Sequence, residues 1–172
     1  MNTLQHFKNI PFKIFPILLI VLYVPFHLFE EAYFNFPFWM FEHYNLPKPL
    51  SYEHWLINNS FFFIVLLIGL ILFLINKSNN LFIGFGILIW GFMNSMEHIL
   101  FSILDLQLSP GFFTAIFFLI IFGLGLLKLL KSKLLNLRLV IKSILIAAIY
   151  WIIPIIVIIM LGSHLVKAFP FN

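Results

Sequence analysis

Long apolar stretches dominate the chain, and short polar segments separate them. Five stretches are long enough to cross a bilayer, because a transmembrane helix needs about 20 mostly apolar residues. They run over about residues 11–30, 55–75, 81–104, 111–130 and 139–161, and the last can continue to residue 168. The runs are continuous rather than alternating, which favours helices over the strands of a membrane barrel. The pattern therefore predicts an all-α fold, a polytopic membrane bundle of five transmembrane helices in one integral domain over residues 1–172.

The composition supports a membrane protein and excludes several other classes. Of the 172 residues, 63% are hydrophobic and only 9% are charged, which is too few charges to cover the surface of a soluble domain. The chain has no cysteine, which excludes disulfides, thiolate metal ligands and cysteine nucleophiles. The ten lysines and arginines are scattered among apolar runs, so we expect no nucleic-acid partner. We expect a multi-pass protein of the cell membrane, with the lipid bilayer as its main partner.

Charge is distributed unevenly between the two ends of the predicted spans. With five spans, eight of the ten cations fall on one side, and only Lys48 and Lys167 fall on the other. Lysine and arginine mark the cytoplasmic side, so we expect the N-terminus inside and the C-terminus outside. All six acidic residues and five of the six histidines then map to the outer half or the outer loops. The outer end is therefore expected to be rich in carboxylate and imidazole groups.

Two short polar stripes lie within the first and third predicted spans. Both have the i, i+3, i+4 spacing that puts three side chains on one face of a helix. The two stripes are His27, Glu30 and Glu31 in the first span and Asn94, Glu97 and His98 in the third. Each lies roughly 24 Å along its span at a rise of 1.5 Å per residue, so both have a similar depth near the outer edge of the hydrocarbon core. They face each other if the two spans pack together.

Ionisable groups at this depth need a partner, a cavity or a function, because one Asp, Lys or Arg at the centre of a span costs at least roughly 2.5–3.5 kcal/mol. Imidazole and carboxylate groups at one level suit zinc, iron or manganese. We predict a divalent metal, zinc or iron, with His27, Glu30, Glu31 and His98 as ligands. Glu30, Glu31 and Glu97 are the candidates for acid–base catalysis, because a carboxylate left over from ligation can act on a metal-bound water. The H-E-x-x-H zinc signature is absent.

Three functions are compatible with this pattern. The first is a metal-dependent membrane enzyme, hydrolase-like in our first interpretation, that acts on a lipid or other amphiphile. The second is a non-enzymatic binder or transporter of an ion, a proton or a small solute. The third is a structural polar network that holds two helices together without metal. The inner halves of all five spans are almost purely apolar, which argues against a transport path and favours a one-sided pocket.

Other polar residues are weaker candidates for the same site. Asn58 and Asn59 either cap the second span at the interface or reach the level of the two stripes. His164 is expected in water at the outer end of the last span. The aromatic segment over residues 34–44 is too short to span, and it suits either an interfacial anchor or a lid.

The connection between the third and fourth spans predicts a capped helix. Ser109 suits the N-cap, and Pro110 suits the first helical position. The free N–H groups of this helix end attract anions. Thr114 lies one turn inside and is expected to line the site.

These residues resemble the HXXEE family of small bacterial multi-span membrane proteins. The naming motif is His27-Leu28-Phe29-Glu30-Glu31. A second element is similar as well, and it comprises Asn94, His98 and the segment Pro110-Gly111-Phe112-Phe113-Thr114. The resemblance extends in order from the first span to the fourth. It implies the same topology and the same site residues, and it does not supply a reaction.

Overall fold

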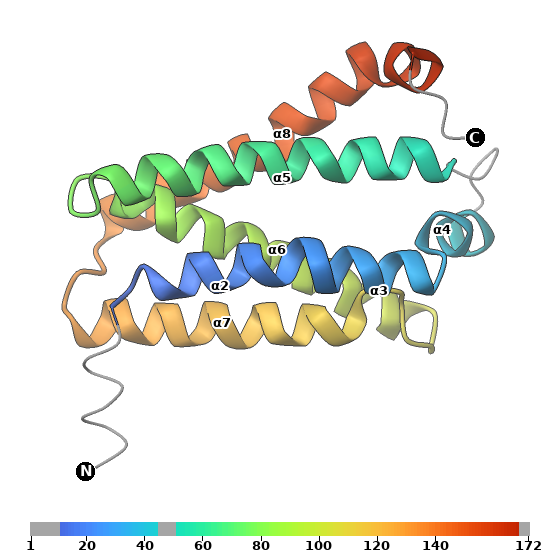
Figure 1. Ribbon diagram of the computed structural model, residues 1–172. Helices are drawn as coiled ribbons and strands as arrows, with labels where there is room; N and C mark the ends of the chain where they lie inside the picture. The colour runs from blue at the N-terminus through green and yellow to red at the C-terminus, as the bar shows by residue number, and fades with distance from the viewer. Residues whose placement is uncertain (1–10, 45–50, 169–172) are drawn as a thin grey trace.

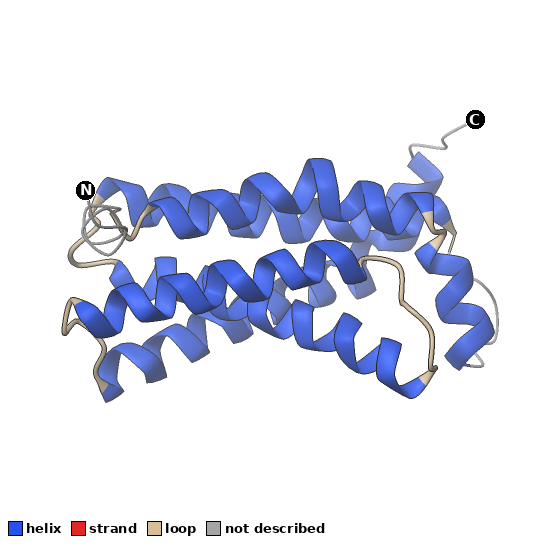
Figure 2. Cartoon of the chain, turned by 90° about the horizontal axis from the view of Figure 1, so that it is seen from below, coloured by secondary structure: helices blue, strands red, loops and turns tan. Residues whose placement is uncertain are grey.

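A computed structural model of the protein describes residues 11–44 and 51–168, without the side chains of residues 158, 159 and 161–168. All regular structure in this part of the chain is helical, which confirms the predicted fold class (Figures 1 and 2). The elements are α2 (Ile14–Leu22), the π-helical turn η1 (Tyr23–His27), α3 (Leu28–Tyr33), α4 (Phe36–Tyr44), α5 (Tyr52–Ile75), α6 (Leu81–Leu104), α7 (Phe112–Lys131) and α8 (Leu137–Ala168).

Five helical runs are long and apolar enough to cross a membrane, as predicted. They are Ile14–Tyr33, Tyr52–Ile75, Leu81–Leu104, Phe112–Lys131 and Leu137–Val157. The first run ends three residues later than expected, because α3 continues past the two glutamates to Tyr33. The chain is therefore a multi-pass membrane protein.

The first span contains a change of helix type just before the polar stripe. Pro25 has no backbone N–H, so it cannot make the usual helical hydrogen bond. The turn around it is π-helical, and the N–H of Leu28 bonds to the carbonyl of Tyr23, five residues earlier. Such a turn accommodates an extra residue and shifts the register of the next helical turns. His27 at the end of this turn and Glu30 and Glu31 after it are all buried.

Helix α6 is the centre of the bundle and contacts α2, α5, α7 and α8. Gly91 allows the close approach of α2, because a Cβ at this position would overlap the side chain of Leu19. Leu19 is completely buried in the apolar core. The expected packing of the first span against the third is therefore present, and it brings the two polar stripes together.

The acids and cations whose side chains are described are segregated to opposite ends of the bundle by their positions along the helices. The cations whose side chains are described lie where α2 and α8 begin and where α5 and α7 end, whereas Lys167 lies near the other end of α8. The acids lie at the opposite end or in the half of a span next to it. Which of the two ends faces the cytoplasm stays a prediction from the charge count.

The aromatic segment after the first span forms the helix α4 across the acidic end of the bundle (Figure 1). Asn35 precedes it with a positive φ of 51°, a conformation that asparagine adopts more readily than most residues. At the other end of α4, the Tyr44 hydroxyl donates to Asp105 at 3.0 Å. Desolvation and this hydrogen bond raise the pKa of Tyr44 to about 12. The hydrogen bond of Tyr44 therefore links α4 to the connection that follows α6.

Candidate metal centre

Three buried side chains from the first and third spans converge on one point. The Nε2 atoms of His27 and His98 lie 3.6 Å and 3.3 Å from the same oxygen, Oε1 of Glu31. The three candidate ligand atoms lie within 4.8 Å of one another, so this group can hold a metal ion. A tetrahedral ion with bonds of about 2.1 Å has ligand atoms roughly 3.4 Å apart, close to the two measured separations.

The second ring nitrogen of His27 fixes its tautomer. Nδ1 of His27 lies 2.7 Å from the Thr114 hydroxyl oxygen, and that hydroxyl donates to Glu30 Oε2, also at 2.7 Å. The same hydroxyl also lies 3.1 Å from the backbone carbonyl of Gly111. Because its one proton goes to either of these two acceptors, the hydroxyl accepts from an Nδ1–H of His27. The lone pair of His27 is then on Nε2 and faces Glu31. A hydrogen bond of this kind behind an imidazole is usual in metal sites, where it orients the ring and raises its basicity.

His98 has a similar arrangement on its far side. Its Nδ1 lies 3.4 Å from the Ser109 hydroxyl oxygen. That hydroxyl donates to the backbone carbonyl of His98 at 2.9 Å, so it too can accept an Nδ1–H. The Ser102 hydroxyl also donates to this carbonyl, at 2.7 Å. With Nδ1 protonated, His98 directs an unprotonated Nε2 toward Glu31, whereas its other neutral tautomer donates Nε2–H to that carboxylate at 3.3 Å.

This arrangement brings three electron-rich atoms together. With Nδ1 protonated on both histidines, two lone pairs and a carboxylate oxygen face one another in a buried space. Their mutual repulsion is relieved either by a metal ion between them or by a proton on one Nε2 that donates to Glu31. The two alternatives correspond to the predicted metal site and to the predicted polar network.

Glu30 lies outside this group of three and faces α7 instead. Its two oxygens accept hydrogen bonds from the backbone N–H groups of Phe113 at 2.9 Å and Thr114 at 2.8 Å. A carboxylate is favourable at a helix N-terminus, where the free N–H groups and the helix dipole attract negative charge. The anion expected at this helix end is therefore a side chain of the protein itself.

The start of α7 differs from the sequence prediction. The helix begins at Phe112, and its N-cap is Gly111, which has no side chain that could cap it. The expectation that Ser109 caps this helix is wrong, because its hydroxyl bonds to His98 instead. Gly111 has a φ of 91°, and a Cβ there would lie 2.6 Å from a carbon of the His98 ring and 2.9 Å from a carbon of the His27 ring. Only glycine fits this position without strain.

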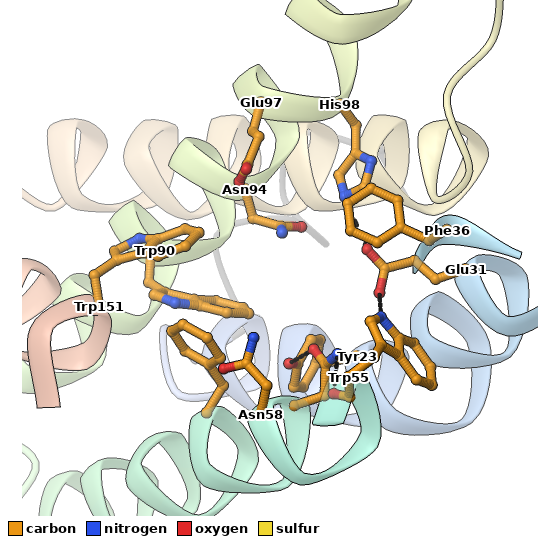
Figure 3. A pocket seen from close by; sticks show the side chains of 12 residues that line it. Tyr23, Glu31, Phe36, Trp55, Asn58, Trp90, Asn94, Glu97, His98 and Trp151 are labelled. Carbon is orange, nitrogen blue, oxygen red and sulfur yellow. Dashed lines mark hydrogen bonds and ion pairs between the residues drawn. The ribbon is translucent and has the colours of Figure 1, made fainter. Parts of the chain in front are cut away.

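A cavity of about 120 Å³ adjoins the candidate ligands His27, Glu31 and His98, which we call the metal group (Figure 3). Glu31 and His98 form part of its wall, and Figure 3 shows Glu31 between His98 and Trp55. Trp55 donates its indole N–H to the second oxygen of Glu31 at 3.2 Å. The rest of the wall is aromatic or polar and consists of Tyr23, Phe36, Asn58, Asn59, Phe62, Trp90, Asn94, Glu97 and Trp151. Two of the three candidate ligands are thus in contact with a space that a small molecule can fill.

The predicted site residues fall into two sets around this cavity. His27, Glu31 and His98 form the metal group, with Glu30 and Thr114 behind His27. The wall of the cavity contains the other predicted residues, Asn94 and Glu97, together with Asn58 and Asn59. The last two do not cap α5, because Ser51 does so. The side chain of His164 lies outside the described residues.

Several residues of the site were not found from the sequence. Tyr23 donates to Asn59 at 2.7 Å, and Trp90 and Trp151 face the cavity from α6 and α8. The sequence does indicate both tryptophans as candidates, because they lie in the middle of spans rather than at the membrane interfaces that tryptophan prefers. The role of Ser109 had no such signal, because it depends on how the connection folds back onto α6.

Comparison with known proteins identifies the family. A family model described as "Protein of unknown function with HXXEE motif" matches residues 18–126, well over half of the chain. The matched range contains the three metal-group residues, Glu30 and Thr114. No curated protein and no solved structure matches the chain. The chain belongs to the HXXEE family.

Proposed function

We propose that this protein is a metal-dependent membrane enzyme with His27, Glu31 and His98 as its ligands. The observation that supports this is the convergence of two Nε2 atoms on one carboxylate oxygen, with both Nδ1 atoms bonded to hydroxyl groups on their far sides. A network without metal has no need to direct both lone pairs inward. The substrate in this proposal is a lipid or other amphiphile whose polar group enters the adjoining cavity.

The ligand set favours zinc or iron. Three protein ligands with an open position are typical of catalytic zinc sites, whereas structural sites use four. Two histidines and one carboxylate also suit non-haem iron. The bound ion supplies either an activated water for hydrolysis, our preferred reaction class, or a centre for oxidation. The same donor set contains no sulfur, in keeping with a chain that has no cysteine.

The surrounding side chains have separate tasks in this proposal. Glu30 and Thr114 are positioning residues that hold the His27 ring with Nε2 toward the centre. Trp55 orients Glu31 through its second oxygen. Of the three carboxylates considered for acid–base work, Glu97 alone has no hydrogen bond among the described residues, and it lines the cavity. We assign Glu97 to contact with the substrate.

Transport is less well supported than a one-sided site. Apolar, fully buried residues lie within about one turn of the cavity on its side away from the acidic end, among them Leu19, Leu66 and Leu88, each 0% exposed. A polar solute therefore has no hydrophilic route past them among the described residues. We infer that the chain forms one membrane domain. From the charge distribution, we also infer that the site opens to the outer side of the cell membrane.

Metal analysis of the purified protein tests the first half of the proposal. We expect about one zinc or iron ion per chain in the parent, and its loss in both His27→Ala and His98→Ala. His54→Ala is the matched control, because among the described residues His54 bonds to Ser51 alone, at the start of α5, and its loss should leave the metal in place. Stoichiometric metal that survives both substitutions refutes the site. A metal-free parent supports the protonated network instead.

The enzymatic half needs a separate assay. The parent and His98→Ala are reconstituted in nanodiscs of defined ester lipids, and released products are followed by mass spectrometry. We expect products with the parent that disappear after chelation and with His98→Ala. Metal binding without any chelator-sensitive product contradicts hydrolysis of these lipids and favours a binding protein.

A further inference from the structure

The cavity beside the metal group has unpaired acceptors in its wall. The side-chain oxygens of Asn58 and Asn94 are inaccessible to solvent and have no hydrogen-bond partner among the described residues. Asn94 is only 8% exposed, and its amide points into the cavity (Figure 3). A buried amide oxygen without a partner is unfavourable, so a ligand that donates to it is stabilised by the hydrogen bond it forms.

The charge of the cavity is negative. Glu31 and Glu97 both line it, and none of its described lining residues is a lysine or an arginine. Glu31 has His27 and His98 beside it and a tryptophan donor on its second oxygen, whereas Glu97 has none of these hydrogen bonds. A metal ion at the centre neutralises Glu31 and leaves Glu97 as the uncompensated charge. A cationic group is therefore the natural ligand beside Glu97.

Aromatic rings complete the wall and favour the same kind of ligand. Trp90, Trp151 and Phe62 pack against one another, with ring centroids 5.2–6.2 Å apart. The negative faces of such rings attract ammonium groups, most strongly where water is excluded. The indole N–H groups of Trp90 and Trp151 also have no partner in the described part of the chain, and they suit an oxygen atom on the same ligand.

We propose that this cavity binds the primary ammonium group of an amine-bearing amphiphile, held by Glu97, Asn58, Asn94 and the tryptophan rings. A primary ammonium has three N–H donors, which match one carboxylate and two amide oxygens. The cavity volume of about 120 Å³ is that of a headgroup with a few heavy atoms rather than of a whole lipid. The inference deepens the proposed function, because it assumes that this cavity is the substrate pocket and names the substrate class.

Ligand selectivity of the parent protein tests the proposal without any substitution. Three of the four tryptophans line the cavity, so intrinsic fluorescence of the protein in nanodiscs reports on its occupancy. We expect a saturable change with n-butylammonium chloride at concentrations where n-butanol and sodium butyrate have no effect. Tetramethylammonium, a cation without N–H donors, should bind about tenfold more weakly. Equal responses to butylammonium and butanol, or to butylammonium and tetramethylammonium, overturn the proposal.

Substitutions locate the binding. Glu97→Gln keeps the size of the side chain and removes its charge, and we expect butylammonium to bind about tenfold or more weakly. Glu42→Gln is the matched control, since Glu42 is exposed on α4 and should leave binding unchanged. Asn94→Leu gives a second variant if Glu97→Gln does not fold, and it should weaken binding as well. Unchanged affinity in a folded variant of either kind overturns the proposal.

The same probe separates this inference from the metal proposal. His27 does not line the cavity, so His27→Ala should lose the metal and still bind butylammonium. Butylammonium binding by a parent without metal removes the proposed enzyme and leaves the ammonium site. Metal in the parent without butylammonium selectivity removes the ammonium site and leaves the metal centre.

Discussion

Replacement of Thr114 by valine removes one hydroxyl and leaves the shape of the side chain nearly unchanged. The backbone N–H of residue 114 still donates to Glu30, so the anchor of α7 is retained. The substitution removes the hydrogen bond that His27 Nδ1 makes to the hydroxyl at 2.7 Å. It also removes the one that the hydroxyl donates, to the Glu30 carboxylate at 2.7 Å or to the Gly111 carbonyl at 3.1 Å. His27 is only 1% exposed, so water cannot replace the lost partner of its Nδ1–H.

The structure sets the size of this effect. A hydrogen bond to a charged group contributes about 1.5–3 kcal/mol, and a buried donor without a partner costs about 1–3 kcal/mol. We expect the free energy of unfolding to fall by roughly 2–4 kcal/mol. Loss of the group that orients a metal-binding histidine weakens metal binding by about 10–100-fold.

Two measurements check this prediction. Competition with a chelator of known affinity gives the metal affinity, and thermal unfolding gives the stability. Thr114→Ser keeps the hydroxyl and is the control, so it should resemble the parent in metal affinity. The reasoning is refuted if Thr114→Val binds metal as tightly as Thr114→Ser, because the hydroxyl would then have no part in orienting His27.

Three further predictions concern the supports of the site. Gly111→Ala should lower the melting temperature and abolish metal binding, because its Cβ would meet the His98 ring and a positive φ costs alanine roughly 1–2 kcal/mol; a variant that keeps its metal contradicts this. Glu30→Gln should lower the free energy of unfolding by about 1–2 kcal/mol, measured by thermal unfolding, because the helix end loses its anion; an unchanged melting curve contradicts this. The raised pKa of Tyr44 means that its contribution to stability is fully present below pH 10 and is lost as the pH rises from 10 to about 12. Tyr44→Phe should remove that part of the pH dependence of unfolding, and an identical profile for both proteins argues against the bond to Asp105.

The spans and the two polar stripes could be predicted because they depend on local spacing. Twenty apolar residues make a span in any context, and the i, i+3, i+4 rule puts His27 and Glu31 on one face of any helix. Their approach to His98 depended only on the packing of two spans. That packing required a small residue, and Gly91 supplies it.

The different tasks of Glu30 and Glu31 could not be predicted, because they are neighbours in one motif. Their environments differ only in the folded protein. There, Glu30 accepts a hydrogen bond from the N-terminus of α7, and Glu31 lies beside the imidazoles. The π-helical turn at Pro25 and the positive φ of Gly111 set these directions. A proline and a glycine in a sequence indicate that the backbone changes, but they do not say which side chains the change will bring together.

X-ray absorption spectroscopy at the metal edge tests the central claim most directly. The structure predicts two imidazole nitrogens and at least one oxygen around the ion at about 2.0–2.2 Å. In any metal that His98→Ala retains, one imidazole should be missing from the spectrum. A coordination shell without imidazole in the parent, or an identical spectrum for the parent and His98→Ala, would show that the metal is bound elsewhere.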